Sequence, residues 1–434
     1  MKQIALINHG CAKNLIDSEL MLGKLAQAGY KITLDDTNAE IVIVNTCSFI
    51  HDAEKESVAS VFDMIKAGKK VIIAGCLPQK YKEELKELIP EASAFLGTSD
   101  LDKIVDVIKN LEKNNTTDYE VSENPEYNYP ETIERQQITV GASSYVKIAD
   151  GCDFNCGYCI IPQLRGKYKS RKIENIVKEV KDLADKGVNE IVLIAQDTTS
   201  YGKDLYGKPK LVELLIELNK IDALNWIRIM YTYPSLITDE LLETISKLDK
   251  VVKYIDIPLQ HVSKNQLELM NRPVLDYKKL IKKIRRIIPN CAIRTTFIVG
   301  YPNETEEDFQ ELCNFVKTMK LDRVGVFEFS REKNTKADKL KPQITAKIKH
   351  QRRKKLMEIQ QSVSKEINEK LIGKKIDCIV EALSSDGIIT ARTYKDAPEV
   401  DGLIYIKTEK NLIPGDIITV EVTGAVEYDL KGIY

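Results

Sequence analysis

The strongest constraint on the fold is an alternation of short apolar strands with longer helical patterns, which occurs in two separate series along the chain. In the first series each apolar run is followed by a polar turn and then by a segment of helical periodicity. Strands are predicted at 3–8, 40–45, 70–74 and 94–97, and helices at 17–28, 52–67, 79–89 and 101–113. Because strands that alternate with helices pair in parallel, residues 1–115 are predicted to form a Rossmann-like αβα domain.

The second series predicts a partial (βα)6 barrel of the TIM type. Its strands are predicted at 145–149, 190–196, 226–231, 254–258, 292–300 and 323–329. One connecting helix shows a 3.6-residue period that places Phe309, Leu312, Cys313, Val316 and Met319 on one face. Together with a basic helix over 346–371, these units predict a domain over residues 141–372, with its chemistry at the carboxyl ends of the strands.

Two further segments complete the predicted organisation. Residues 116–140 are polar and contain Pro125 and Pro130, which is typical of a linker. After Gly373 the pattern changes to short strands separated by turns at Ser385-Asp-Gly, Val400-Asp-Gly and Pro414-Gly-Asp. This pattern predicts a small, closed, all-β barrel of the OB-like kind over residues 373–434.

The composition leaves the partner open and makes the cysteines informative. The 434 residues carry 64 Lys and Arg against 65 Asp and Glu, so the global charge argues neither for nor against a nucleic-acid partner. The chain has no apolar run long enough to span a membrane and no signal-peptide pattern at its start, so we expect a cytoplasmic protein. In a reducing cytoplasm its nine cysteines indicate metal ligation or core packing rather than disulfides.

A first cysteine cluster follows the first predicted barrel strand. Cys152-Asp-Phe-Asn-Cys156-Gly-Tyr-Cys159 has the pattern C-x-x-x-C-x-x-C. Thiolates at short local spacing suit an iron-sulfur cluster or zinc. Three thiolates leave one iron of a four-iron cluster open, whereas structural zinc sites close with four ligands, and neither the neighbouring sequence nor His261 supplies an obvious fourth. Zinc and unliganded thiols remain as alternatives.

A second set consists of Cys11, Cys47 and Cys76, which are far apart in sequence. Each follows directly on one of the first three predicted strands. The carboxyl ends of parallel strands lie along one edge of a sheet, where ligands collect, so three thiolates can converge there. The number three again predicts a four-iron cluster with a free iron. The alternative is that the three cysteines are small apolar residues of the core.

The first cluster, with Tyr158 before its last cysteine, resembles the signature of radical S-adenosylmethionine (SAM) enzymes. The resemblance implies that SAM binds the open iron through its amino and carboxylate groups and yields a 5′-deoxyadenosyl radical that abstracts hydrogen from a substrate. Phe297-Ile-Val-Gly-Tyr-Pro-Asn-Glu304 is similar to a strand motif that packs near the adenine in these enzymes. We therefore expect Tyr158, Gln196, Asp197, Gly300 and Glu304 to contribute to SAM binding.

The presence of both cysteine sets resembles the methylthiotransferases, and this resemblance covers essentially the whole chain. It implies an amino-terminal domain with an auxiliary 4Fe-4S cluster on Cys11, Cys47 and Cys76, a radical SAM barrel and a carboxyl-terminal TRAM domain. It also implies that all six cysteines are catalytic, with Cys152, Cys156 and Cys159 holding the second 4Fe-4S cluster. In that family a sulfur, or a methylated sulfur, on the auxiliary cluster is inserted into an unactivated C–H bond.

Local motifs are similar to the branch of this family that modifies the β-carbon of an aspartate in ribosomal protein S-twelve. Gly10-Cys-Ala-Lys-Asn-Leu-Ile-Asp-Ser-Glu19 follows the usual G-C-P-K-N-x-x-D-S-E of that branch except for Ala12. Residues 195–202, 256–261 and 427–430 are also similar to it. The predicted carboxyl-terminal barrel is acidic, with seven Lys or Arg and eleven Asp or Glu over 371–434, which favours a basic protein over tRNA.

Several alternatives stay open at this point. The chain could be a tRNA adenosine 2-methylthiotransferase, or a non-catalytic metal-cluster protein that binds the ribosome or RNA. An electron donor of the flavodoxin or ferredoxin type is expected, whereas direct nucleic-acid binding and a membrane partner are not. Arg165 could face the substrate or pair with a carboxylate. Cys291, Cys313 and Cys378 are predicted to be packing residues.

Overall fold

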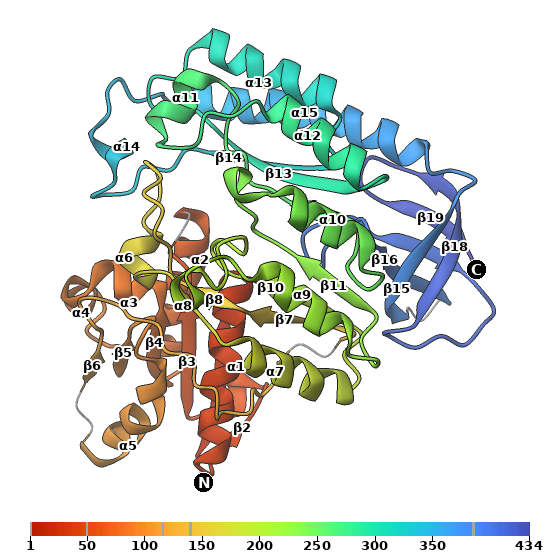
Figure 1. Cartoon of the computed structure of the whole chain (residues 1–434). Helices are drawn as coiled ribbons and strands as arrows, with labels where there is room; N and C mark the ends of the chain where they lie inside the picture. The colour runs from red at the N-terminus through yellow and green to blue at the C-terminus, as the bar shows by residue number, and fades with distance from the viewer. Residues whose placement is uncertain (1, 49–50, 115–116, 139–140, 384–386) are drawn as a thin grey trace. The chain divides into compact units, whose positions relative to one another are not determined.

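The computed structural model describes residues 2–48, 51–114, 117–138, 141–383 and 387–434, and the chain divides into two compact units (Figure 1). Unit one consists of Met1–Val140, Ala149–Phe154 and Cys159–Lys169. Unit two consists of Gly141–Ile148, Asn155–Tyr158 and Ser170–Tyr434. The segment with the clustered cysteines is therefore shared, because Cys152 and Cys159 belong to unit one and Cys156 to unit two.

Unit one contains a six-stranded parallel sheet of strand order β2-β1-β3-β4-β5-β6. Its strands are β1 (Gln3–Asn8), β2 (Lys31–Ile32), β3 (Ile41–Thr46), β4 (Lys70–Gly75), β5 (Ala94–Leu96) and β6 (Asp118–Glu120). The order confirms the predicted Rossmann-like sheet. Strand β6 lies within the predicted linker, where it pairs with β5 and continues the sheet.

Helices cover both faces of this sheet because alternate residues of each buried strand point to opposite sides. Ile41 and Ile43 pack in one core with α1 (Ala12–Gln27) and α5 (Ile104–Asn114). Val42 and Val44 pack in the other with α2 (His51–Lys66), α3 (Cys76–Tyr81) and α4 (Glu83–Leu88). Short elements of the unit are η1 (Asp36–Asn38), η2 (Leu101–Lys103), α6 (Ile161–Arg165) and β8 (Ala149–Asp150).

Two helices differ from their predicted extents. The helix predicted over 79–89 is divided into α3 and α4 at Lys82, whose φ of 51° breaks the helical hydrogen-bond series. Helix α1 begins at Ala12 rather than at Asp17. Cys11 has an extended backbone and is the N-cap, so the helix includes five residues before the predicted start.

Unit two contains six parallel strands whose spatial order follows the sequence. They are β7 (Ser143–Lys147), β10 (Glu190–Ile194), β11 (Trp226–Ile229), β12 (Tyr254–Asp256), β13 (Ala292–Val299) and β14 (Arg323–Glu328). They form two three-stranded sheets, β7-β10-β11 and β12-β13-β14. A parallel bridge between Ile227 and Val251 joins β11 to the segment before β12. The six strand-helix units confirm the predicted partial barrel.

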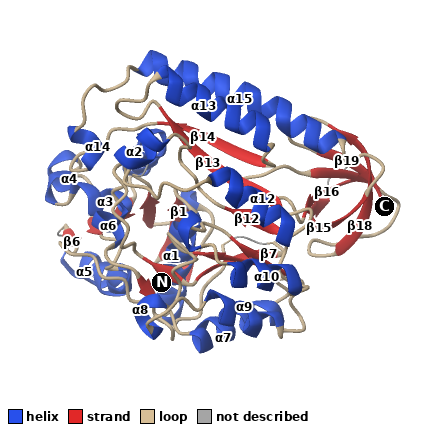
Figure 2. Ribbon diagram, turned by 45° about the horizontal axis from the view of Figure 1, so that its top comes forward, coloured by secondary structure: helices blue, strands red, loops and turns tan. Residues whose placement is uncertain are grey.

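Helices follow the strands of unit two, as Figure 2 shows in blue. They are α7 (Ile173–Asp185), α8 (Lys203–Tyr206), α9 (Leu211–Asn219), α10 (Asp239–Lys247), α11 (Lys264–Leu269), α12 (Tyr277–Ile287), α13 (Glu306–Met319), α14 (Lys336–Lys339) and α15 (Ala346–Glu369), with β9 (Lys169–Ser170) and η3 (Pro234–Leu236) between them. The predicted apolar face of α13 is confirmed, since all five of its residues are buried. Helix α15 packs against β14 and α13.

The carboxyl-terminal part of unit two is a closed five-stranded barrel, as predicted, of strand order β15-β16-β17-β19-β18. Its strands are β15 (Lys375–Leu383), β16 (Ile388–Thr393), β17 (Ile404–Lys407), β18 (Ile417–Ala425) and β19 (Leu430–Ile433). The predicted turn at Ser385-Asp-Gly lies largely outside the described residues, which resume at Gly387. Apolar side chains that alternate along the strands fill the barrel interior.

Buried ion pairs join this small barrel to the amino ends of the larger barrel's strands. The Arg392 guanidinium on β16 contacts the Glu190 carboxylate at the start of β10. Arg323, at the start of β14, pairs with Asp396. The small barrel therefore lies at the strand ends opposite to those that carry chemistry in TIM-type barrels.

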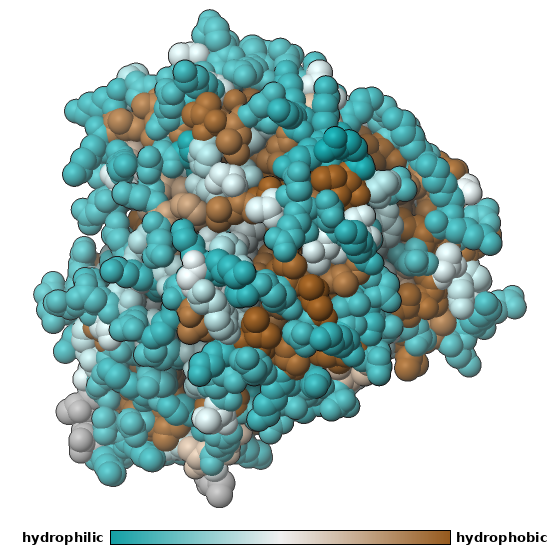
Figure 3. All heavy atoms as spheres, viewed as in Figure 1, coloured by the Kyte–Doolittle hydropathy of each residue, from teal (hydrophilic) through white to brown (hydrophobic). Residues whose placement is uncertain are grey.

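The surface view in Figure 3 shows hydrophilic residues over most of one face, with smaller apolar areas between them. No helix among the described residues combines the length and apolar character needed to cross a membrane.

We predict that acid weakens the attachment of the small barrel through Glu190. Burial alone would raise the pKa of Glu190, but Arg392 and Arg228 outweigh it and lower the pKa from 4.5 to about 2. A carboxylate with a lowered pKa stabilises the fold above its unfolded-state pKa, and that contribution is lost as the pH falls from 4.5 towards 2. Thermal unfolding from pH 7 to pH 2 should therefore show a steeper loss of Tm below pH 4.5 in the parent protein than in Glu190→Gln. Equal slopes would contradict this role, and Glu217→Gln, at an exposed position, serves as the control.

Candidate functional site

The pairing register of unit one brings Cys11, Cys47 and Cys76 to one edge of its sheet. Asn8 of β1 is opposite Asn45 of β3, and Thr46 of β3 is opposite Gly75 of β4. Each cysteine follows its strand end within three residues. The three strands are adjacent and parallel, so all three cysteines leave the sheet at its carboxyl edge. Their role as cluster ligands stays a prediction.

Asn14, in the first turn of α1, lies between Cys11 and Cys76. Its Oδ1 is 3.6 Å from the Cys11 Sγ and 3.9 Å from the Cys76 Sγ. Its Nδ2 donates a 2.9 Å hydrogen bond to the carbonyl oxygen of Thr46, which fixes the orientation of the amide. The buried Asn14 amide therefore contacts two of the three thiols and is held in position by the end of β3.

The two thiols have opposite electrostatic settings. Cys11 is an exposed residue, and desolvation of its sulfur by nearby groups would by itself raise its pKa. The charges of Lys13 and Arg165 and the backbone N–H groups of the first helical turn outweigh this effect and lower the pKa. Burial raises the pKa of Cys76, although Arg165 opposes that effect. Since the thiolate is the metal-binding form, Cys11 at its helix N-terminus is the better prepared ligand.

Backbone geometry fixes Cys47 and Cys76. The Cys47 N–H donates a 3.0 Å hydrogen bond to Ser57 Oγ on α2. Gly75, directly before Cys76, has a φ of 92°, and a Cβ built there would lie 2.3 Å from the Oδ1 of Asn45. Only glycine allows the chain to turn from β4 into α3 at this position.

A second glycine of this kind precedes Cys152 in unit one. Gly151 has a φ of 76°, and a Cβ built on it would lie 2.0 Å from the carbonyl oxygen of Lys167. The Cys152 N–H donates a 3.1 Å hydrogen bond to the carbonyl oxygen of Gly166. This hydrogen bond joins the two ends of segment 152–166, which contains the three clustered cysteines. Cys159 accepts a 3.4 Å contact at its Sγ from the N–H of Ile161.

Cys156 belongs to unit two, where its neighbour is Arg272. The Arg272 guanidinium is 4.0 Å from the Cys156 Sγ and lies over the ring of Tyr233 at 4.4 Å from its centroid. It also donates a 2.5 Å hydrogen bond to the carbonyl oxygen of Pro258. Arg272 is buried, so its charge acts on the sulfur with little screening.

Each set offers three cysteine thiols, and thiolates are the usual ligands of iron-sulfur clusters. Across the ranges that the structure describes, no three His, Cys, Asp or Glu side chains gather closely enough to hold one metal ion. In a four-iron cluster each thiolate binds a different iron atom, so its ligands stand further apart than the ligands of one ion. Each set also has a buried arginine near one sulfur, which suits an anionic cluster.

The predicted SAM-binding residues Tyr158, Gln196 and Asp197 lie in unit two. Tyr158 packs edge-on against Tyr301, with ring centroids 6.5 Å apart. Gln196 and Asp197 directly follow β10, and Gln196 is half-buried. Burial raises the pKa of Asp197, although hydrogen bonds from Ser200 and Thr199 oppose that effect. The Asp197 carboxylate thus orders its own loop, and its contact with SAM stays a prediction.

Gly300 and Glu304 belong to a buried network after β13. The Glu304 Oε2 accepts hydrogen bonds of 2.5 Å from the Gly300 N–H and 2.6 Å from Arg352 Nη1 on α15. Its Oε1 is 3.1 Å from His261 Nε2. Both carboxylate oxygens are therefore engaged by the protein, and a role in SAM binding stays a prediction for this pair of residues too.

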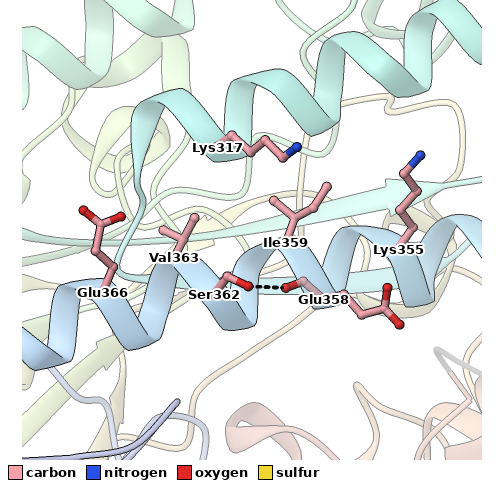
Figure 4. A pocket seen from close by; sticks show the side chains of 7 residues that line it. All are labelled: Lys317, Lys355, Glu358, Ile359, Ser362, Val363 and Glu366. Atoms are coloured by element: carbon pink, nitrogen blue, oxygen red, sulfur yellow. Dashed lines mark hydrogen bonds between the residues drawn. The ribbon is translucent and has the colours of Figure 1, made fainter.

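A surface groove of about 450 Å³ lies between α13 and α15 (Figure 4). It is lined by Lys317, Lys355, Glu358, Ile359, Ser362, Val363 and Glu366. The lining has no cysteine and none of the residues expected to bind SAM. The groove is therefore not assigned to the reaction.

Two residues beside the cysteines, Asn14 and Arg272, have no role predicted from the sequence patterns. Asn14 stood within the motif of residues 10–19, and its spacing of three from Cys11 on a helix was the available signal. Arg272 had no local signal, because its place beside Cys156 depends on tertiary structure. The structure resolves the alternatives for Arg165, which is buried and paired with two carboxylates.

Three family models match the chain. The radical SAM superfamily matches residues 146–316, an uncharacterized protein family, UPF0004, matches residues 3–97, and the TRAM domain matches residues 372–434. The matched ranges correspond to the larger barrel, the parallel sheet and the closed small barrel.

Curated relatives match over the full length. The ribosomal protein uS12 methylthiotransferase RimO of Caldanaerobacter subterraneus subsp. tengcongensis is 48% identical, with 100% of each chain covered. That of Clostridioides difficile is 47% identical over 100% of this chain and 98% of the relative. The chain belongs to the RimO family. It is a radical SAM methylthiotransferase, and membership implies SAM and 4Fe-4S clusters as cofactors.

Solved structures show the same fold at much lower identity. The radical SAM methyltransferase TsrM from Kitasatospora setae, with cobalamin and a [4Fe-4S] cluster bound, has a TM-score of 0.56 at 12% identity. The match covers 90% of this chain and 80% of TsrM. A second TsrM structure, with tryptophan and a SAM analogue, has a TM-score of 0.54 at 13% identity, with 75% and 73% covered.

We predict that Glu304 is required for stability. Glu304→Ala would leave the buried Arg352 with only the exposed Glu306 carboxylate as a charge partner, and breaking a buried pair costs about 3–5 kcal/mol of unfolding free energy. Urea unfolding of the variant measures this loss. Glu306→Ala, which removes an exposed carboxylate 3.5 Å from the same arginine, should change stability by less than about 1 kcal/mol. Unchanged stability of Glu304→Ala with loss of SAM binding would instead assign Glu304 to the cofactor.

Proposed function

We propose that this RimO-family enzyme adds a methylthio group to the β-carbon of an aspartate in ribosomal protein uS12, the S-twelve considered above. The observation that carries the proposal is identity of 44–48% with proteins named for that activity, over essentially the whole chain. Such identity extends through both cysteine-bearing domains and the small barrel. The modified residue and atom belong to the proposal.

We propose distinct roles for the two cysteine sets. Cys152, Cys156 and Cys159 would hold the cluster that binds SAM, and Cys11, Cys47 and Cys76 would hold the auxiliary cluster. When bound, SAM and its cluster supply the means of hydrogen abstraction, and the auxiliary cluster supplies the sulfur. The protein's own residues orient the thiols through Asn14 and surround Cys76 with buried groups that exclude water.

The acidic charge of the small barrel supports a basic protein partner less strongly than its composition indicated. Asp396 and Asp401 are buried, and they pair with Arg323 and with Arg294, which lies 3.5 Å from Asp401. These two carboxylates attach the small barrel to the larger one and are not available to a basic partner. Preference for uS12 over tRNA therefore rests on the identity with the relatives.

We also propose a cytoplasmic location and a one-electron donor of the flavodoxin or ferredoxin class. Both parts of this proposal rest on chemistry. Reduction of a 4Fe-4S cluster requires single electrons, and reduced clusters and free thiols need a reducing compartment. Direct binding of nucleic acid is not part of the proposal.

Mass spectrometry of cells that lack the gene tests the function. The uS12 aspartate should lose its methylthio group, a change that is restored by the intact gene, while methylthiolated adenosines of tRNA are unchanged. Unchanged uS12 with loss of a tRNA methylthio group would establish the rival tRNA activity instead.

Substitutions in the two cysteine sets should affect different steps of the reaction in vitro. Cys152→Ala should abolish 5′-deoxyadenosine formation from SAM under dithionite, because the SAM-binding cluster loses a ligand. Cys47→Ala should keep 5′-deoxyadenosine formation but stop methylthiolation of a uS12 peptide, since only the auxiliary site is changed. Cys313→Ala, which removes a buried thiol on α13, serves as the control and should keep both activities. Methylthiolation by Cys47→Ala would contradict the auxiliary role.

A further inference from the structure

Arg165 is a buried arginine at the end of α6, six residues after Cys159. Its side chain is only 3% exposed. A buried guanidinium is costly unless its charge is paired and its N–H groups are hydrogen-bonded. The contacts of Arg165 therefore indicate which function its buried charge serves.

Two carboxylates hold one terminal nitrogen of the guanidinium. The Nη1 of Arg165 is 2.6 Å from Asp17 Oδ2 and 3.1 Å from Asp150 Oδ2. Asp17 lies on α1, the helix whose N-cap is Cys11, and Asp150 stands two residues before Cys152. Both carboxylates are buried. One arginine thus joins a helix of the auxiliary site to the start of the cysteine segment, within unit one.

The other terminal nitrogen faces the auxiliary cysteines. The Nη2 of Arg165 donates a 2.8 Å hydrogen bond to Asn14 Oδ1 and lies 3.9 Å from the Cys76 Sγ. Because the guanidinium is a rigid planar fork, fixing Nη1 on two carboxylates also fixes Nη2. A lysine ammonium is a single point and cannot make both sets of contacts.

Packing and backbone contacts strengthen this arrangement. Ile160 and Leu164, on the same segment as Arg165, pack against Cys76 in one small apolar cluster. The carbonyl oxygen of Gly166, the next residue, accepts the hydrogen bond from the Cys152 N–H. The segment 160–166 therefore contacts one candidate ligand of each cysteine set, Cys76 of the auxiliary set and Cys152 of the clustered set.

Structural pairing alone does not explain why this network lies beside a cysteine. A buried ionic network is seldom more stabilising than apolar residues of similar volume. This one combines two buried carboxylates with one buried guanidinium, whose Nη2 lies 3.9 Å from the Cys76 Sγ. The position of the network is explained if the positive charge of Arg165 acts electrostatically on a cluster bound by Cys76.

We propose that Arg165 is a positioning residue that sets the electrostatic environment of the auxiliary cluster on its Cys76 side and links that site to the Cys152 segment. The inference rests on the proposed function, since it concerns the cluster assigned to Cys11, Cys47 and Cys76. A cation close to Cys76 favours the reduced, more negative state of that cluster. Displacing or removing it lowers the midpoint reduction potential.

The test isolates the auxiliary site in the full-length protein. The parent carries Cys152→Ala, Cys156→Ala and Cys159→Ala, so that only the auxiliary set can load on anaerobic reconstitution with iron and sulfide. Two substitutions are added to it separately. Arg165→Lys keeps the charge but loses the fork. Arg165→Met with Asp17→Asn removes one charge of each sign, so that the net charge of the network stays the same although Asp150 loses its arginine partner.

Iron and sulfide content, the EPR spectrum of the reduced cluster and its midpoint potential are measured on each protein. We expect the parent to bind one cluster, and both Arg165 variants to show a lower potential and an altered EPR spectrum. Arg323→Lys in the same parent is the matched control, because it changes another buried arginine-carboxylate pair, in unit two, and should leave both readouts unchanged.

The outcomes separate the two proposals. A parent that binds one cluster, with the same potential and spectrum in both Arg165 variants, would overturn the role of Arg165 and leave the proposed function standing. A parent that binds no cluster would overturn the assignment of Cys11, Cys47 and Cys76, and this inference with it.

Discussion

Parallel pairing in register at the carboxyl edge of the unit-one sheet is the constraint on which the candidate auxiliary site depends. Cys11, Cys47 and Cys76 are distant in sequence, and only the alignment of β1, β3 and β4 brings them to one edge. A shift of one residue in either pairing would move a cysteine along the strand direction, away from the other cysteines, and would turn the side chains of the shifted strand to the opposite faces. The two apolar cores prevent that shift, because Ile41 and Val42 are buried on opposite faces.

Buried ion pairs organise other parts of the molecule. In unit one, Asp17 and Asp150 surround Arg165 beside Cys76. In unit two, Glu190 pairs with Arg392 where the small barrel meets the larger one. Such pairs contribute little net stability, but they are costly to break, and their directional hydrogen bonds fix how elements meet.

Much of the fold followed from local patterns. The strands of both series, the apolar face of α13 and the closed small barrel were predicted because hydrophobic period and turn residues are local signals. The errors lay where tertiary contacts override local preference. Lys82 breaks a predicted helix with a positive φ, and β6 forms within a polar segment because the exposed edge of β5 is available for pairing.

The sequence by itself determined which residues can carry the chemistry. The spacing of Cys152, Cys156 and Cys159 is local, and the position of Cys11, Cys47 and Cys76 after strands follows from the alternating pattern. Only the tertiary structure decided what surrounds them: Arg165 on Asp17, Asp150 and Cys76, Arg272 beside Cys156, and Glu304 engaged on both oxygens. Candidate ligands can be recognised from short spacings and from strand topology. The ion-pair partners of a buried charge come from segments that are distant in sequence, so no local pattern predicts them.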